Sequence, residues 1–501
     1  MTQAIQSIVI VGGGTAGWMA AAALSHFLRK RQVAIHLIES PDIGTIGVGE
    51  ATLPGIRDFN LALGIDEIDF IKETQATFKL GIEFVGWKNQ QSDFFHPFSN
   101  YGQSMYGADF YQVWQHLRKQ NKVEELSHYC LSTMLATQGR FAQPRENPQT
   151  PLAEYNYAFH FDASLYANYL RKYAVKNGVI RHEKTVTQVT QTDTGFIAGV
   201  TFNDATSLTG DLFIDCSGIR GLLIEETLQT GFEDWSHWLP VNSAAAVQSK
   251  SAAPPTPYTK SIAMESGWRW RIPLQHRVGN GYVYCDDFIS DIDAKQHLLD
   301  SLDGQALSEP RTIKFKTGRR NQFWHKNCIA VGLSSGFLEP LESTSISLIQ
   351  TAISKLIMFF PDKSFNQTDI DEANRQASLE MEHIRDFILL HYKLSERTDT
   401  EFWRHIQSIK MPASLEHKIN VFKRRGYIVE HEGESFKSAS WISMYNGFDV
   451  MPNESQIKLD HLDMPQLEQQ LKQMATLIQK GATAAPLHQE FISRHCSAPE
   501  K

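Results

Sequence analysis

The apolar positions near the start of the chain predict a strand, a turn, a helix and a second strand. Residues 7–11 form a continuous apolar run rich in β-branched side chains, which is typical of a strand buried on both faces of a sheet. Glycines follow at once, and an alanine-rich segment from Trp18 to Leu28 has the composition of a helix. A second apolar run, residues 31–38, predicts the next strand and ends on Glu39. This order is typical of a doubly wound, Rossmann-like α/β domain.

Helical patterns dominate the last part of the chain. A helix is predicted over residues 346–360, and from about Asp369 the chain is rich in helix formers and poor in β-branched runs. Another helix is expected to begin at Asp463 and to end at Gly481, which are typical residues for those two positions. We therefore expect an α/β domain over residues 1–365 and a mainly helical domain over residues 366–501. The apolar stripe of the helix from Asp463 consists of Leu467, Leu471, Met474 and Ile478.

Composition narrows the class of protein. At 501 residues the chain is too long for a single core, and its 42% hydrophobic and 21% charged residues are ordinary for a globular protein. The net charge of −8 argues against nucleic acid or an anionic membrane surface as a partner. No apolar run reaches the roughly 18 residues that a membrane helix needs. The five cysteines form no CxxC pair, so we expect reduced thiols in a cytoplasmic protein and no metal site.

The glycine-rich turn after the first strand has the spacing of a dinucleotide-binding loop. Gly12-Gly13-Gly14-Thr15-Ala16-Gly17 contains GxGxxG between a strand and a helix, and an acid, Glu39, follows about 20 residues later. Gly12 permits the tight turn, Gly14 lets a pyrophosphate approach the backbone, and Gly17 lets the helix pack on the strand. Glu39 is expected to accept hydrogen bonds from ribose hydroxyls.

The motif alone does not separate FAD from NAD. Its position at the start of a long chain favours FAD as a resident cofactor. Residues 209–218 form an apolar strand that ends in small residues and resembles the strand closing the dinucleotide site of flavoprotein hydroxylases. An ordinary strand and turn is an equally good interpretation of that segment.

Residues 268–273 read WxWxIP, and their period of two places Trp268 and Trp270 on the same face of a strand. A paired aromatic core is the simpler interpretation. Next to GxGxxG, however, the motif resembles the flavin-dependent halogenases of the tryptophan halogenase family, in which two such tryptophans sit by the flavin. Gly47-Val48-Gly49-Glu50-Ala51-Thr52 is similar to the family's flavin-contacting loop. The resemblance implies that Gly49, Glu50, Ala51, Trp268 and Trp270 contact FAD.

The same resemblance implies the chemistry. Residues 336–346 look like the family's segment for the halide and the catalytic glutamate, which is Glu342 here, and Lys79 occupies the place of the catalytic lysine. Reduced FAD, O2 and a halide would give hypohalous acid, which Lys79 would deliver to the substrate. Backbone N–H groups of Thr344 and Ser345 would bind the halide at a helix start. Many members have glycine in place of Ser345, so bromide and chloride both stay open. Without the resemblance, Lys79 and Glu342 would be read as exposed charges.

The resemblance also points to a substrate pocket for an electron-rich aromatic molecule. His96-Pro97-Phe98 lies where the family stacks a His-Pro-Phe segment on the substrate ring. A packed aromatic loop is an equally good interpretation of these residues. Trp441 is a candidate for the far wall of the pocket, although its spacing of four from Tyr445 also suits one buried helix face.

The runner-up is an FAD-dependent aromatic hydroxylase, a monooxygenase that needs no halide. Leu333 follows Gly332 where flavin hydroxylases carry an acid, which argues against it. All the dinucleotide motifs point to one site, so we expect a separate NAD(P)H-dependent flavin reductase to supply FADH2. A homodimer is left open.

We predict that indole or a larger indole derivative is a better substrate than free tryptophan. Tryptophan halogenases grip the amino and carboxyl groups with a paired tyrosine and an acid, and this chain contains no Tyr-Tyr pair. Competition kinetics with equal concentrations of the two compounds would measure the preference directly. A higher kcat/KM for tryptophan would contradict the prediction.

Overall fold

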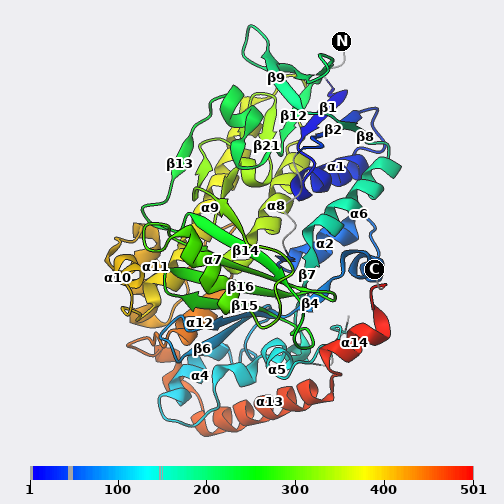
Figure 1. Ribbon diagram of the computed structural model, residues 1–501. Helices are drawn as coiled ribbons and strands as arrows, with labels where there is room; N and C mark the ends of the chain where they lie inside the picture. The colour runs from blue at the N-terminus through cyan, green and yellow to red at the C-terminus, as the bar shows by residue number, and fades with distance from the viewer. Residues whose placement is uncertain (1–3, 43–48, 146–147, 149, 500–501) are drawn as a thin grey trace.

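The computed structural model describes residues 4–42, 49–145, 148 and 150–499, and its upper part in Figure 1 is built on a six-stranded sheet. Strands β12 and β1 are central and parallel, and β2 continues the parallel order on the other side of β1, with Val9 beside His36. Only the edge strand β20 runs antiparallel to its neighbour. The strands in spatial order are β20 (Trp324–His325), β21 (Cys328–Ala330), β12 (Leu212–Asp215), β1 (Ser7–Val11), β2 (Ala34–Glu39) and β8 (Ile180–Glu183).

A seven-stranded mixed sheet occupies the middle of the molecule and brings the two tryptophans of the WxWxIP motif close to residues 81–97. Its one parallel pair joins β15 to β5, and the other pairs are antiparallel. Its strands in spatial order are β18 (Arg311–Lys314), β14 (Ser243–Ser249), β17 (Val278–Tyr284), β16 (Gly267–Pro273), β15 (Thr259–Met264), β5 (Gly81–Val85) and β6 (Asp93–Pro97).

Three smaller three-stranded sheets complete the β structure of the described residues. The sheet β3–β7–β4 links the two large sheets and carries Lys79 at the end of β4, with Lys79 beside Ala158. The strands of the three sheets are β3 (Gly49–Ala51), β7 (Ala158–Asp162) and β4 (Thr77–Lys79); β11 (Ser207–Thr209), β10 (Ile197–Phe202) and β9 (Val186–Gln191); and β13 (Phe232–Asp234), β19 (Gly318–Arg320) and β22 (Gly336–Phe337).

Helices cover both large sheets. In the first two-thirds of the chain they are α1 (Thr15–Phe27), α2 (Gly55–Ala62), α3 (Glu67–Thr74), α4 (Phe110–Arg118), α5 (Leu131–Thr137), α6 (Ala163–Lys176) and α7 (Asp291–Asp300). Later helices are α8 (Thr344–Met358), α9 (Gln367–Leu394), α10 (Glu401–Ser408), α11 (Ala413–Arg425), α12 (Ser438–Gly447), α13 (Met464–Ala484) and α14 (His488–His495). Among the described residues, none of these helices is long and apolar enough to cross a membrane.

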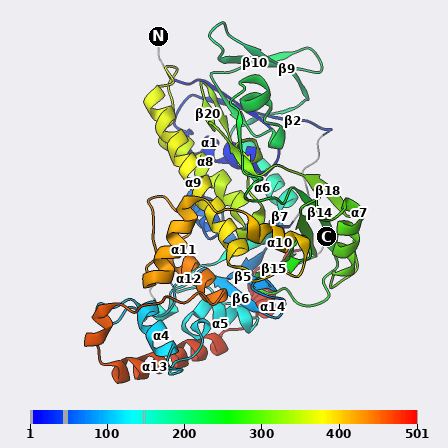
Figure 2. The same ribbon diagram turned by 90° about the vertical axis from the view of Figure 1, so that its left-hand side faces the viewer.

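The C-terminal helices share a hydrophobic core with the seven-stranded sheet. The long helix α9 runs beside the sheets in both views, and α10 to α13 lie below and to the side of it (Figures 1 and 2). Buried side chains of β16, α9 and α12, such as Trp268, Phe387 and Trp441, belong to one cluster. The chain becomes mainly helical near residue 366, but one hydrophobic core includes residues from both sides of this point.

Some helix boundaries differ from the sequence prediction. Helix α1 begins at Thr15 and α8 at Thr344, each a few residues earlier than expected. Asp463 caps α13 by accepting a hydrogen bond from Gln466 N, as predicted. The prediction that Gly481 ends α13 is wrong, because the helix continues to Ala484. Burial of Ala482 extends the apolar stripe beyond the glycine and outweighs its cost of about 1 kcal/mol relative to alanine.

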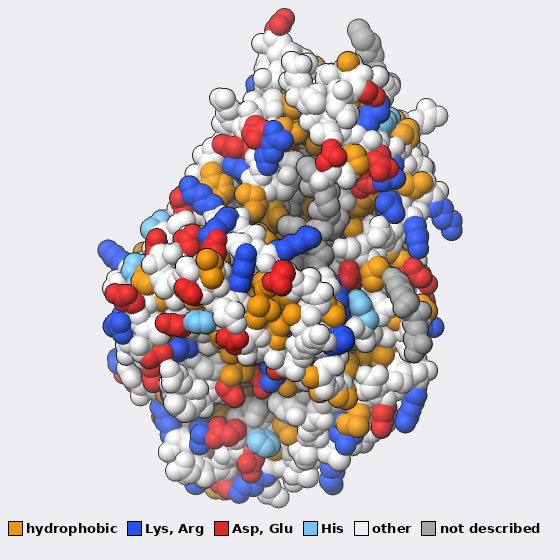
Figure 3. Space-filling model, in the orientation of Figure 1, with side chains coloured by type: hydrophobic (Ala, Val, Ile, Leu, Met, Phe, Trp, Pro, Cys, Tyr) orange, Lys and Arg blue, Asp and Glu red, His pale blue; other side chains and the backbone are white. Residues whose placement is uncertain are grey.

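On the face seen in Figure 3, neither acidic nor basic side chains predominate. Apolar side chains gather near the middle of this face, and acidic and basic side chains are interspersed around them (Figure 3). This distribution on one face agrees with the small negative net charge of the chain.

The glycine-rich turn between β1 and α1 is packed against its surroundings on one side and open on the other. A Cβ atom on Gly17 would lie 1.8 Å from the carbonyl oxygen of Gly12, so helix α1 needs a glycine there to approach the strand. Gly12 has a φ of +123°, which disfavours any side chain. A Cβ on Gly14 would meet nothing within 4 Å, and the φ of Gly14 is an ordinary −76°.

We predict that two alanine substitutions in this turn affect different properties, one the stability of the protein and the other its affinity for FAD. Gly17→Ala should lower the free energy of unfolding by roughly 1–3 kcal/mol, the usual cost of forcing extra atoms into a packed site. Gly14→Ala should change the free energy of unfolding by less than about 0.5 kcal/mol but weaken FAD binding, because the open side is where a pyrophosphate would approach. Thermal unfolding and FAD fluorescence titration would measure the two effects. Equal affinity for FAD in Gly14→Ala and wild type would argue against the loop as a cofactor site.

Candidate active site

Lys79 is fully buried at the end of β4, which excludes the interpretation of a surface lysine. Its Nζ donates hydrogen bonds to the Thr52 carbonyl at 3.0 Å and to Ser343 Oγ at 2.7 Å, and it lies 5.0 Å from the centre of the Phe98 ring. Burial lowers the pKa of Lys79 to about 7, although the nearby negative charge of Glu342 acts in the opposite direction. The amine is therefore held in place and titrates close to neutral pH.

Glu342 is also fully buried and lies between two histidines. It ends the 3-10 turn Pro340–Glu342, and its carboxylate is 2.9 Å from His96 Nδ1 and 2.8 Å from His391 Nε2. Burial alone would raise the pKa of this carboxyl group, but the charge and hydrogen bonds of His96 and His391 outweigh it and lower the pKa to about 2. A buried carboxylate thus stays negative beside the lysine.

The start of helix α8 lies directly beside these two groups. Ser343, whose hydroxyl accepts from Lys79, has a left-handed φ of +61°, and the helix begins at the next residue. No side chain caps this helix start, and the buried Thr344 Oγ1 has no hydrogen-bond partner among the described residues. Ser345 is half-buried in the same turn. Free N–H groups and an unpaired hydroxyl are what an anion would bind at this position.

The structure brings the His-Pro-Phe segment to the same place. His96, in β6, is buried with its Nδ1 directed at Glu342, and Phe98 lies against the Lys79 ammonium just after Pro97 ends the strand. The sequence suggested His96 only as a contact for a substrate ring. The contact between His96 and the Glu342 carboxylate was not predicted, because the two residues are 246 positions apart in the sequence.

Trp441 continues an aromatic wall from His96. The ring of His96 lies 6.3 Å from Phe436, which stacks on Phe387 at 4.0 Å, and Phe387 contacts Trp441 edge to face at 5.3 Å. Trp441 and Tyr445 are both buried on α12, as one helix face should be. Trp441 is therefore joined to His96 through aromatic rings, whereas the ring beside the Lys79 ammonium is that of Phe98.

Trp268 and Trp270 lie on the same face of β16, as their spacing predicted, with ring centres 6.2 Å apart. The indole N–H of Trp268 donates to Glu339 Oε2, which also accepts from the Tyr392 hydroxyl at 2.8 Å. Burial raises the pKa of Glu339 to about 7, against the effect of these two hydrogen bonds. The WxWxIP strand is thereby tied to the segment that supplies Glu342.

Five of the residues suggested for FAD, namely Gly12, Gly14, Thr15, Ala16 and Gly17, lie in the first β–α turn or at the start of α1. Ala16, at the start of α1, packs close to Gly332, where a Cβ would approach it to 2.8 Å. Glu39 accepts from Trp18 Nε1 at 3.2 Å and from Arg181. Gly49, Glu50 and Ala51 form β3, while Gly47 and Val48 of the same motif lie outside the described residues. An uncapped helix start beside an open glycine fits a pyrophosphate, so the site suits FAD.

His391 was missed by sequence reasoning. It follows the apolar run Phe387–Leu390 on α9, and this run could have signalled a buried histidine but not its partner. Glu342 and His391 are 49 positions apart in the sequence, so no local pattern connects them.

Comparison with known proteins identifies the family. A model of the tryptophan halogenase family matches residues 7–464. Tryptophan 6-halogenase ThaL of Streptomyces albogriseolus is 37% identical over 450 residues, which cover 84% of this chain and 83% of ThaL. Tryptophan 7-halogenase RebH of Lentzea aerocolonigenes is 35% identical over 444 residues, or 84% of this chain and 83% of RebH.

A solved structure agrees. BrvH, a flavin-dependent halogenase from Brevundimonas sp. BAL3, superimposes with a TM-score of 0.95 and 44% sequence identity, covering 98% of this chain and 100% of BrvH. ThaL, RebH and BrvH are all halogenases, so none of the three supports an aromatic hydroxylase. The extent of the family match and the shared fold show that this chain belongs to the tryptophan halogenase family and is a flavin-dependent oxidoreductase of the halogenase class.

Proposed function

We propose that the protein uses FADH2, O2 and a halide to halogenate an electron-rich aromatic such as indole or an indole derivative. The observation that supports this most directly is the burial of the Lys79 amine, 2.7 Å from Ser343 Oγ, between a charged Glu342 and the start of α8. A hydroxylase has no need for such a site. When bound, reduced FAD supplies the electrons with which O2 and halide are converted to hypohalous acid.

The residues proposed to hold FAD are those of the glycine-rich turn and its neighbours. Backbone N–H groups at the start of α1 would bind the pyrophosphate, and Glu39 retains lone pairs for ribose hydroxyls. The indoles of the WxWxIP strand would separate the flavin from the substrate. The full set is Gly12, Gly14, Thr15, Ala16, Gly17, Glu39, Gly49, Glu50, Ala51, Trp268 and Trp270.

Lys79 is proposed to receive the hypohalous acid and to direct it to one carbon of the substrate. Its two hydrogen bonds fix the amine, and its surroundings exclude the water into which a free oxidant would escape. A pKa of about 7 leaves part of the amine neutral at physiological pH, so that it can donate a hydrogen bond or act as a nucleophile.

Glu342 is proposed to stabilise the positive charge that develops on the aromatic ring and to take up the ring proton. The negative charge is already in place because the pKa of Glu342 is about 2, and in a buried site it interacts strongly with a nearby cation. Thr344 and Ser345 are proposed to bind the halide through backbone N–H groups. The unpaired Thr344 hydroxyl supports an anion there, and both bromide and chloride suit such a site.

The aromatic substrate is proposed to lie against His96, Pro97 and Phe98 on one side and toward Trp441 on the other. The chain of aromatic rings from His96 to Trp441 supplies the flat apolar surface that an indole would need. A separate NAD(P)H-dependent flavin reductase is proposed to provide FADH2, because the glycine-rich dinucleotide loop that the structure describes is the one between β1 and α1.

We predict that Lys79→Met abolishes halogenation and leaves FAD binding intact. Methionine keeps most of the buried volume but removes the amine, so kcat should fall by roughly 100- to 10,000-fold, the usual contribution of one acid–base group. Mass spectrometry of products from FAD, a flavin reductase, NADH, O2 and indole, with bromide and chloride in parallel, would measure the loss. Wild-type activity in this variant would contradict the role of Lys79, and a hydroxylated product from wild type would contradict the reaction.

We also predict that Lys79 makes the stability of the protein depend on pH. The pKa of Lys79 is about 7 in the folded protein and ordinarily 10.5, so the unfolded chain binds more protons between these values and stability rises with pH there. Lys79→Met lacks this effect, so the free energy of unfolding of the variant relative to wild type should be more favourable at pH 6 than at pH 9. Urea unfolding of both proteins at the two pH values tests this, and a constant difference would contradict it.

A further inference from the structure

Both ring nitrogens of His391 face oxygen atoms, so its contacts require one proton more than a neutral imidazole and a carboxylate provide. His391 Nδ1 lies 2.8 Å from the Phe387 carbonyl oxygen, which can only accept, so Nδ1 carries a hydrogen. Nε2 lies 2.8 Å from Glu342 Oε1. If His391 were neutral and Glu342 ionised, two lone pairs would face each other across this contact. One additional proton must therefore lie between the two residues.

His96 places no such demand on the site. It approaches Glu342 through Nδ1 alone, at 2.9 and 3.1 Å from the two carboxylate oxygens, and a neutral imidazole with its hydrogen on Nδ1 satisfies both contacts. The extra proton thus belongs to the contact between Glu342 and His391, and the two histidines are not equivalent.

A second glutamate in the same segment shows what the histidines change. Glu339, three residues earlier, is equally buried but receives hydrogen bonds from the neutral donors Trp268 and Tyr392, and its pKa is raised to about 7. Glu342 faces His96 and His391 instead, and its pKa is lowered to about 2. An extra proton on His391, as an imidazolium beside a carboxylate, accounts for both contacts of the ring.

The surroundings of the pair leave few other charges to affect it. His391 is fully buried, and its ring lies against Phe84 of β5 and Trp87, with ring centres 4.9 and 6.0 Å away, and against Phe387 of α9. The titratable groups that face Glu342 are His391 of α9, His96 of β6 and Lys79 of β4.

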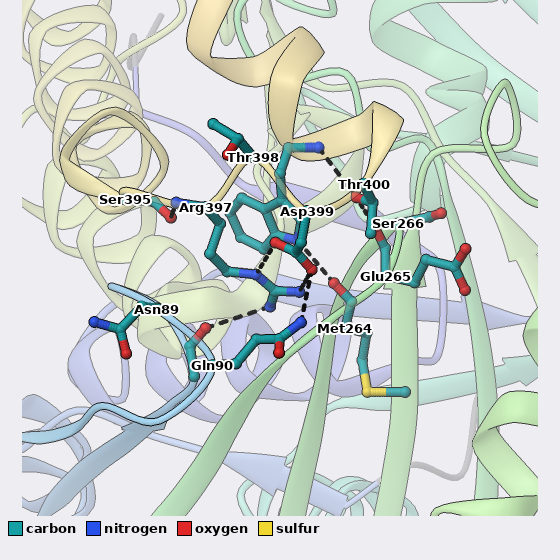
Figure 4. Close-up of polar contacts among 12 residues, drawn as sticks. Asn89, Gln90, Met264, Glu265, Ser266, Ser395, Arg397, Thr398, Asp399 and Thr400 are labelled. Atoms are coloured by element: carbon teal, nitrogen blue, oxygen red, sulfur yellow. Dashed lines mark hydrogen bonds and ion pairs between the residues drawn. The ribbon is translucent and has the colours of Figure 1, made fainter.

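The end of α9 is held firmly, which fixes the position of His391. Just beyond the helix, Ser395 Oγ donates to the Trp87 carbonyl, and Arg397 donates to the Gly86 carbonyl. Arg397 also pairs with Asp399 (Figure 4). Gln90 also donates to Asp399 in the same cluster. Gly86, Gln90, Arg397 and Asp399 line a surface cavity of about 500 Å³ bordered by β5 and β15, which is separate from Lys79 and Glu342.

We infer that His391 is a positioning residue for halogenation: as an imidazolium at the end of α9, it keeps Glu342 ionised and oriented toward Lys79. The inference rests on the proposed catalytic role of Glu342. It means that the C-terminal helical segment completes the catalytic site as well as covering the substrate. Its charge acts through Glu342 and touches no reacting atom.

Two substitutions separate charge from hydrogen bonding. His391→Gln places a neutral N–H donor near the position of Nε2 and keeps the contact with Glu342, whereas His391→Asn places its donor near Nδ1 and loses that contact. His383→Gln, two turns earlier on α9, is the matched control. It makes the same substitution at a histidine whose ring stacks with His431, while the histidines that contact Glu342 are His96 and His391. FAD binding and the melting temperature would establish that each variant folds.

We expect a pH-dependent loss in His391→Gln. Without the imidazolium, the pKa of Glu342 should rise, so a larger fraction of Glu342 would be protonated at pH 6 than in wild type. The ratio of variant to wild-type kcat for indole should therefore be lower at pH 6 than at pH 8, with KM unchanged. His391→Asn should be impaired at both pH values, and the control at neither. A ratio for His391→Gln that is independent of pH would overturn the inference while wild-type halogenation still supports the proposed function.

A second measurement does not depend on activity. In protein labelled with ¹⁵N-histidine, wild type at pH 8 should show one imidazole with both nitrogens protonated, and His391→Asn and Glu342→Gln should each lack this signal. If the signal is missing in wild type, the inference is wrong whatever the enzyme produces. If the signal is present but no halogenated product forms with any aromatic tested, the proposed function fails and the charge state of His391 stands.

Discussion

The structure depends on keeping a lysine and a glutamate able to carry charge in a fully buried site. Moving an isolated charge into a protein interior costs many kcal/mol, and the cost is tolerable only when the charge is paired and hydrogen-bonded. Lys79 meets this requirement through Thr52 and Ser343, and Glu342 through His96 and His391. Each partner comes from a different segment, so the need to solvate these two groups dictates which elements must meet.

This requirement explains how the sheets and helices are joined. The small sheet β3–β7–β4 carries Lys79 to the boundary between the two large sheets, and β6 supplies His96 from the edge of the seven-stranded sheet. Helix α9 then crosses to the same point and contributes His391 from the C-terminal segment. The continuous hydrophobic core around these residues excludes water, which strengthens every interaction within the site.

The contrast between Glu339 and Glu342 shows how finely local partners set the chemistry. Both are buried in one short segment, yet neutral donors leave Glu339 with a pKa of about 7 and histidines hold that of Glu342 at about 2. Trp268 donates to Glu339 and so links the WxWxIP strand to the segment that carries Glu342. A site that must confine a reactive oxidant thus combines an ionised carboxylate with a wall of aromatic side chains.

The sequence by itself determined the local structure. The first β–α–β unit, the strand with both tryptophans on one face, and the helices after residue 366 follow from apolar periodicity and from glycine, which are local properties. The motifs also led to Lys79, Glu342 and His96. Only the tertiary structure decided that Lys79 is buried, that His96 faces Glu342 and that His391 joins them, because burial and charge pairing depend on segments up to 264 residues apart. The end of α13 beyond Gly481 likewise depended on packing, since burial of Ala482 outweighs a weak local preference.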